Sequence, residues 1–186
     1  DPKIIVQEIK RLSTTIRGRI AAEERLKNAG EYAVPYMLSV LQDESRKNEF
    51  PYITEALPKI GRSAIRPLVA ALQMEDAGIK IEIIRALGKI GYFEPLPYLK
   101  LVVEQTPSEQ LRTQAVNAIE QINPDALKIP AAELFFELAE SYYNGDDALS
   151  APAEYDFANV WFWDEGNQSL TRQEVGYVFA FDLTIP

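Results

Sequence analysis

The stretches ALPKIG at residues 56–61 and ALGKIG at residues 86–91 decide the fold, because the same short pattern recurs along the chain at nearly constant spacing. A third stretch, AIEQIN at residues 118–123, carries the pattern with Asn in place of the closing Gly. An earlier unit closes at Gly30, and successive closing residues are 31, 30 and 32 positions apart. A recurring period of this length indicates a repeat protein in which each repeat is one supersecondary unit.

Each unit has apolar residues eight, four and one positions before its closing residue, which is the spacing of one helical face. The residues at the first two of these positions are Ala22 and Leu26, Ile53 and Leu57, Ile83 and Leu87, and Ala115 and Ile119. We expect each closing Gly, and Asn123 in the last unit, to end this first helix in the left-handed conformation that Gly and Asn tolerate best.

A second apolar set follows each closing Gly and predicts a second helix. Prolines near the start of this helix support the prediction, because the first turn does not need their missing N–H. These prolines are Pro35, Pro67, and Pro95 or Pro97. Pro58 falls inside the first helix of the second unit, where it predicts a kink or a shortened helix. Neither helix buries its apolar stripe alone, so the units are expected to stack as a solenoid whose second helices line a concave face.

The repeated stretches, together with AVPYML at residues 33–38, resemble the signature of HEAT repeats, in particular the short bacterial HEAT-like type of phycobilisome lyases. The resemblance covers about residues 14–125. A further family feature is a basic residue seven positions before the Leu of the pattern. In this chain that position holds Arg19, Phe50, Lys80 and Arg112. The resemblance implies an all-α solenoid of about four HEAT-like helix-turn-helix repeats over residues 1–129.

The C-terminal part of the chain breaks the pattern. Residues 130–145 form one more amphipathic helix, which is expected to cap the stack. Residues 146–186 form an acidic, aromatic-rich element. Within it, the runs at 159–163 and 168–175 flank a polar turn and predict a small β-hairpin, and 177–183 is a candidate third strand. We expect this hairpin or extended element to pack on the end of the solenoid.

The composition argues against several function classes. The chain of 186 residues has no Cys and no His, which removes thiolate metal sites, cysteine nucleophiles and the commonest general base, so no catalysis, cofactor or metal site is predicted. No apolar stretch approaches the roughly 18 residues of a membrane span. The net charge is −9, and residues 131–186 hold 11 acids and one base, Arg172. An acidic surface repels phosphate, so nucleic acid is not an expected partner.

Six residues are predicted to bind a protein partner. Tyr32, Tyr36, Arg66 and Tyr98 are expected on the second helices, and tyrosines with arginine are typical of interaction surfaces. Trp161 and Trp163 point to the same side of the predicted strand. Their rings either cover the solenoid, form an exposed patch that docks a partner, or stack on a ligand such as a sugar or a base. The acidic residues around them indicate a solvated face rather than a metal site.

Three functions remain open. The first is a non-catalytic scaffold or adaptor that binds a protein, and this is the function we predict. The second is a lyase or chaperone that acts on a chromophore or protein client, which the resemblance alone suggests. The third is nucleic-acid binding, which the acidity disfavours. The chain begins at Asp1 without a Met and ends after an apolar run, so we expect a module of a larger protein or complex, cytoplasmic by default.

Overall fold

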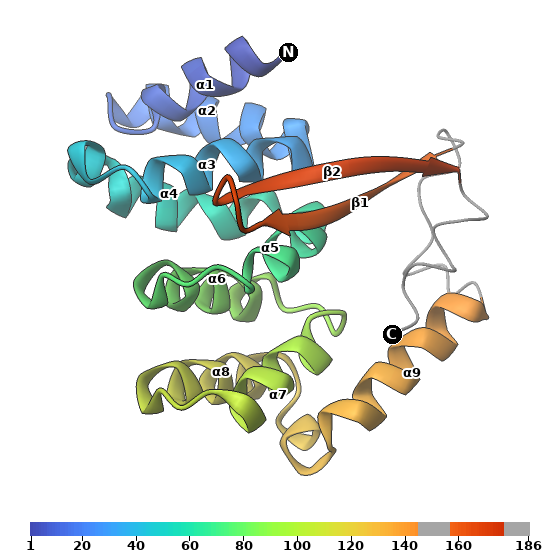
Figure 1. The fold of residues 1–186 in the computed structure, drawn as a ribbon. Helices are drawn as coiled ribbons and strands as arrows, with labels where there is room; N and C mark the ends of the chain where they lie inside the picture. Colours follow the sequence, from blue (N-terminus) through green and yellow to red (C-terminus); the bar gives the residue numbers. More distant parts are fainter. Residues whose placement is uncertain (145–156, 177–186) are drawn as a thin grey trace.

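The computed structural model describes residues 1–144 and 157–176 as a helical array with one β-hairpin (Figure 1). The α-helices are α1 (Pro2–Arg11), α2 (Ile16–Ala29), α3 (Val34–Leu41), α4 (Phe50–Ala56), α5 (Ile65–Ala71), α6 (Ala77–Ile90), α7 (Leu96–Gln105), α8 (Glu109–Ile122) and α9 (Ala131–Tyr143). Short 3₁₀ segments are η1 (Gly30–Ala33), η2 (Glu44–Glu49), η3 (Leu57–Ile60), η4 (Arg62–Ala64) and η5 (Pro124–Lys128). The strands are β1 (Phe157–Asp164) and β2 (Ser169–Gly176). No helix in these two described ranges is long and apolar enough to cross a membrane.

The helices stack in two rows, which confirms the predicted solenoid (Figure 1). The first helices α2, α4, α6 and α8 form one row, in which α6 packs against α8, and both α2 and α6 contact η3 at the end of α4. The second helices α3, α5 and α7 form the other row and pack against α4, α6 and α8 in turn. Helix α1 precedes the first unit and contacts α2 and α3. Neighbouring units thus share one continuous core.

Tight turns between the two helices of a unit depend on glycine. Gly30, Gly61 and Gly91 have φ angles of 60°, 80° and 77°, a region that other residues rarely adopt. Only Gly91, with a ψ of 17°, has the left-handed helical conformation that we expected, because the ψ angles of Gly30 and Gly61 are −137° and −151°. The same expectation for Asn123 was wrong, because its φ of −159° is extended. The Asn123 side chain instead accepts a hydrogen bond from the backbone N–H of Asp125 at 3.1 Å and so begins η5. The last unit therefore closes with an N-cap rather than a left-handed turn.

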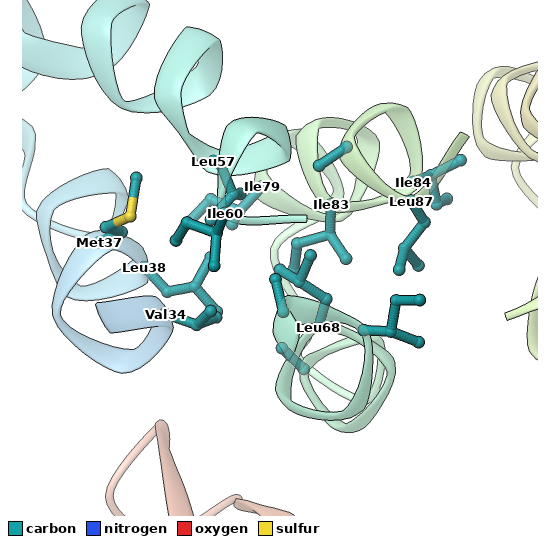
Figure 2. Packing of buried hydrophobic residues seen from close by; sticks show 14 of the residues in the cluster. Val34, Met37, Leu38, Leu57, Ile60, Leu68, Ile79, Ile83, Ile84 and Leu87 are labelled. Atoms are coloured by element: carbon teal, nitrogen blue, oxygen red, sulfur yellow. The ribbon is translucent and has the colours of Figure 1, made fainter. Parts of the chain in front are cut away.

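The apolar positions predicted from the repeat form the core. The residues eight and four positions before each closing residue are all at most 1% exposed. Figure 2 shows how Leu57, Ile83 and Leu87 of the first helices meet Val34, Leu38 and Leu68 of the second helices. Pro58 shortens the first helix of its unit as predicted, since α4 ends at Ala56 and the chain continues as η3. Hydrophobic burial between rows is thus the main force that holds the units together.

Arginine at the basic position of the repeat pattern, Arg19 or Arg112, contacts the helix that precedes its own. Arg19 donates from Nε to the carbonyl of Leu12 at 3.0 Å, and its guanidinium lies 4.5 Å from the ring centroid of Tyr52. Arg112 donates in the same way to the carbonyls of Val103 and Thr106, at 3.3 and 2.7 Å. These carbonyls stand at or just beyond the end of the preceding helix, where the helix leaves acceptors unpaired. The basic residue therefore fixes the entry of each such first helix.

Helix α9 packs against α7, on the side of the second helices (Figure 1). The ring of Tyr98 in α7 meets the ring of Phe135 edge-on, with centroids 4.8 Å apart. Lys100 of α7 donates to the carbonyl of Leu127, just before α9, at 2.6 Å. The helix predicted as a cap over residues 130–145 thus packs on α7, the last of the three second helices.

The hairpin lies across the second helices and not at the end of the solenoid, where we expected it (Figure 1). Both strands contact α5, and β2 also contacts α3. The strands are antiparallel, with Trp161 opposite Arg172 and Trp163 opposite Leu170. The expectation was wrong because side chains of the first repeats, more than 100 positions earlier in the sequence, provide the surface on which the hairpin is seated. The candidate strand at 177–183 lies outside the described residues.

Candidate protein interface

The two faces of strand β1 differ as the alternation of the sequence predicts. Asn159, Trp161 and Trp163 are buried against the solenoid, whereas Phe162 points the other way and is 45% exposed. The bulky aromatic side chains of one face therefore displace water from the second helices, which stabilises the seated hairpin. We call the surface that receives them the hairpin seat: it consists of Glu31, Tyr32 and Gln42 together with α5.

Glu31 is the central polar residue of the hairpin seat. Its carboxylate accepts a hydrogen bond from the indole Nε1–H of Trp161 at 2.7 Å and another from the side-chain amide of Asn159. The same amide of Asn159 also donates to the hydroxyl of Tyr32 at 3.0 Å. Glu31 follows Gly30 directly and lies in η1, so the turn with positive φ at Gly30 places it just before the start of α3. Hydrogen bonds to a charged acceptor are stronger than neutral ones, so this carboxylate orients the hairpin.

A second set of contacts fixes β2. Arg172 donates to the side-chain oxygen of Asn159 at 2.9 Å and pairs with Glu174 at 2.8 Å. Its guanidinium lies 4.9 Å from the ring centroid of Tyr32, a cation–π contact. Near the turn of the hairpin, the side-chain amide of Gln42 donates to the carbonyl of Gln168 at 2.9 Å. Arg172, the one base among residues 131–186, thus connects the two strands to the first repeat.

The hairpin turn is closed by Asp164. Its carboxylate accepts from the backbone N–H of Asn167 at 3.1 Å and from the Asn167 side chain at 2.7 Å. These hydrogen bonds favour the charged form and lower the pKa of Asp164 below its ordinary value. Gln168 then takes a positive φ of 48°, which reverses the chain into β2. A local network therefore sets the register that keeps both indoles on the inner face.

Trp163 is buried on the inner face of the hairpin, and its indole N–H has no partner among the described residues. The side chain joins the hydrophobic core of the repeats, but its buried Nε1–H finds no acceptor among the residues of the two described ranges. A buried donor without an acceptor costs about 1–3 kcal/mol. The seat is therefore well matched to Trp161, whose N–H meets Glu31, and less well matched to Trp163.

The structure separates the six predicted residues into two places. Tyr32, Trp161 and Trp163 meet at or beside the hairpin seat. Tyr98 and Arg66 lie instead near α9: Tyr98 packs on Phe135, and the guanidinium of Arg66 lies 5.9 Å from the ring centroid of Tyr142. Tyr36 is half-buried and packs against the core. Contact of these six residues with another protein stays a prediction.

Four residues of this contact were not predicted: Glu31 and Gln42 of the hairpin seat, and Asn159 and Arg172 of the hairpin. One feature of the sequence could have indicated Glu31: it directly follows a closing Gly. The residue after the closing Gly begins the turn toward the second helix in each unit. Arg62 has the same position in the next unit, where it forms a bidentate ion pair with the buried Glu94. The distances between its guanidinium nitrogens and the carboxylate oxygens are 3.1 to 3.3 Å. In the first two units, the residue that follows the closing Gly thus makes polar contacts on the second-helix side.

Tyr98 provides a test of the α7–α9 contact through pH. Burial raises the pKa of Tyr98 above its ordinary value; Tyr142 adds to this rise and Arg66 opposes it. In the unfolded chain the Tyr98 hydroxyl ionises at about pH 10, whereas in the folded chain it stays protonated to higher pH. The free energy of unfolding therefore loses a contribution from Tyr98 as the pH rises above about 10.

We expect the free energy of unfolding of the wild type to fall, relative to that of Tyr98→Phe, as the pH rises above about 10, as measured by urea unfolding at about pH 8 and about pH 11. The variant keeps the ring that packs on Phe135 but has no ionisable hydroxyl. Equal pH dependence of the two proteins would contradict the burial of this hydroxyl.

The two rows of stacked helix pairs define the protein as an α-helical repeat protein of the solenoid class. Within it, residues 34–120 match the model of a family described as HEAT repeats. Residues 34–120 therefore carry HEAT repeats, which are commonly protein-interaction scaffolds. A comparison with curated proteins gives no significant match.

Proposed function

We propose that this protein is a non-catalytic interaction scaffold whose second-helix face binds extended, aromatic segments of other proteins. The observation that carries the proposal is the hairpin seat itself. On this face, the chain binds one of its own extended segments through two buried indoles and the carboxylate of Glu31. The chemistry that holds this internal segment is equally suited to a partner segment with a tryptophan and a side-chain amide.

The recognition mechanism combines a rigid surface with one strong acceptor. Stacked repeats hold the second helices in fixed positions, so a bound segment loses its own freedom but does not have to order the scaffold. Apolar rings supply buried area, while Glu31 selects segments that present an N–H donor at the right place. An apolar segment without such a donor would leave the carboxylate unpaired, which makes the surface selective.

The experiment is a selection of displayed random peptides on the full chain with the hairpin unseated by the double substitution Trp161→Ala and Trp163→Ala. We expect the selected peptides to be rich in tryptophan and to bind this variant. Adding Glu31→Ala should weaken their binding at least about tenfold, because a charge-assisted hydrogen bond is lost. Circular dichroism of each variant checks that the helices remain.

The matched control is Glu44→Ala, which removes an exposed carboxylate from η2, outside the hairpin seat. It should leave peptide binding unchanged. Selected peptides with no preference for aromatic residues, or with equal affinity for the Glu31→Ala and Glu44→Ala proteins, would refute the proposal.

A further inference from the structure

Two helix faces far from the hairpin seat expose large apolar side chains. On α9, Phe136 is 62% and Tyr143 is 85% exposed, and their spacing of seven residues places them on one face. On α2, Ile16 is 76% and Ile20 is 63% exposed, one turn apart. Single exposed apolar residues are ordinary, but two on the same helix face form a patch that gains from being covered.

The charges around the two patches are of opposite sign. Glu133, Glu137 and Glu140 run along the exposed side of α9, and α9 itself carries no base. None of the three forms an ion pair with another residue in 1–144 or 157–176. An apolar ridge bordered by acids fits a partner surface that combines apolar and basic side chains.

The exposed patch on α2 combines apolar and basic side chains in this way. Ile16 and Ile20 line a shallow hollow together with Arg17, Ala21 and Glu24. Arg17 and the nearby Lys27 are exposed and, within the described part of the chain, have no ion-pair partner. The exposed Lys3 and Lys10 of the adjacent α1 add positive charge to this end of the array, against the single acid Glu24 in the hollow.

We propose that the α9 face of one copy binds the α2 face of a second copy. Phe136 and Tyr143 would cover Ile16 and Ile20, and the glutamates of α9 would meet Arg17 and Lys27. The two faces belong to the two ends of the helical array (Figure 1). The contact therefore joins unlike surfaces and leaves one of each free in a pair of molecules, so longer head-to-tail assemblies can form.

The size of the two patches determines how strong the self-association should be. Four large side chains with a few charges cover less than the roughly 800 Å² per partner of a stable complex. Self-association should therefore be reversible and should increase with protein concentration, with salt weakening its ionic part.

The test is sedimentation velocity of the full chain over a concentration series, with two variants at exposed positions that should fold normally. The wild type should sediment faster as its concentration rises. Phe136→Glu blocks the α9 face and Ile20→Glu blocks the α2 face, so each variant alone should stay monomeric at 21.0 kDa. Mixed together they should form a pair, because each variant retains the face that the other has lost. The control Phe162→Glu, on the outer face of the hairpin, should associate like the wild type.

Three results would overturn the proposal: a wild type that stays monomeric throughout the series, association that either variant retains alone, or a mixture of the two variants that remains monomeric. All three are independent of peptide binding at the hairpin seat, so this inference and the proposed scaffold function succeed or fail separately.

Discussion

Replacing Leu87 by alanine should lower the free energy of unfolding by about 2–5 kcal/mol, because it leaves a cavity in the layer that joins the repeats. Leu87 is fully buried in α6, which contacts η3, α5 and α8 (Figure 2). In a solenoid each unit is stabilised by its neighbours, and α6 stands in the middle of the array. The cavity therefore weakens the packing of its own unit and of the units on both sides.

The measurement is urea unfolding followed by circular dichroism, with Lys89→Ala as the control. Lys89 lies two residues further along α6 and is exposed, so its truncation should change the free energy of unfolding by less than about 0.5 kcal/mol. If Leu87→Ala destabilised the protein no more than Lys89→Ala does, the core assigned from the repeat pattern would be incorrect.

The repeat array could be predicted from sequence because its information is local. A helix face is visible as a spacing of three or four residues, and a closing glycine marks the turn that follows. Leu26, Leu57 and Leu87 share one position of the pattern and one environment in the structure. The prediction for Asn123 was wrong because Asn suits both a left-handed turn and an N-cap. Here Pro124 follows it, and a following proline favours the extended backbone of the N-cap.

The position of the hairpin could not be predicted because its contacts are not local. Trp161 and Glu31 are 130 residues apart, and no periodicity links them. The alternation of β1 does predict that Trp161 and Phe162 face opposite sides, but not which surface buries the indole. Glu31 also resembles any other solvated acid of a helical protein until an N–H donor is placed against it. The polar residues of the hairpin seat thus needed a three-dimensional structure.

Trp161→Ala should detach the hairpin while the helical array stays folded. A two-stranded hairpin is marginally stable by itself in water, so β1 and β2 depend on their contact with α3 and α5. Removing a buried Trp side chain costs about 3–5 kcal/mol, and here it also deprives Glu31 of a donor.

Hydrogen exchange followed by mass spectrometry separates local detachment from global unfolding. In Trp161→Ala the amides of β1 and β2 should exchange faster, and those of η1 should follow because Glu31 loses its partners. The amides of α6 and α8 should keep their protection, since neither helix contacts the hairpin appreciably. Phe162→Ala is the matched control: it removes an exposed ring from the same strand and should leave the exchange of η1 unchanged. Equal exchange of η1 in the two variants would mean that the hairpin is not held through Glu31, whereas loss of protection in α6 and α8 as well would mean that the hairpin stabilises the whole array.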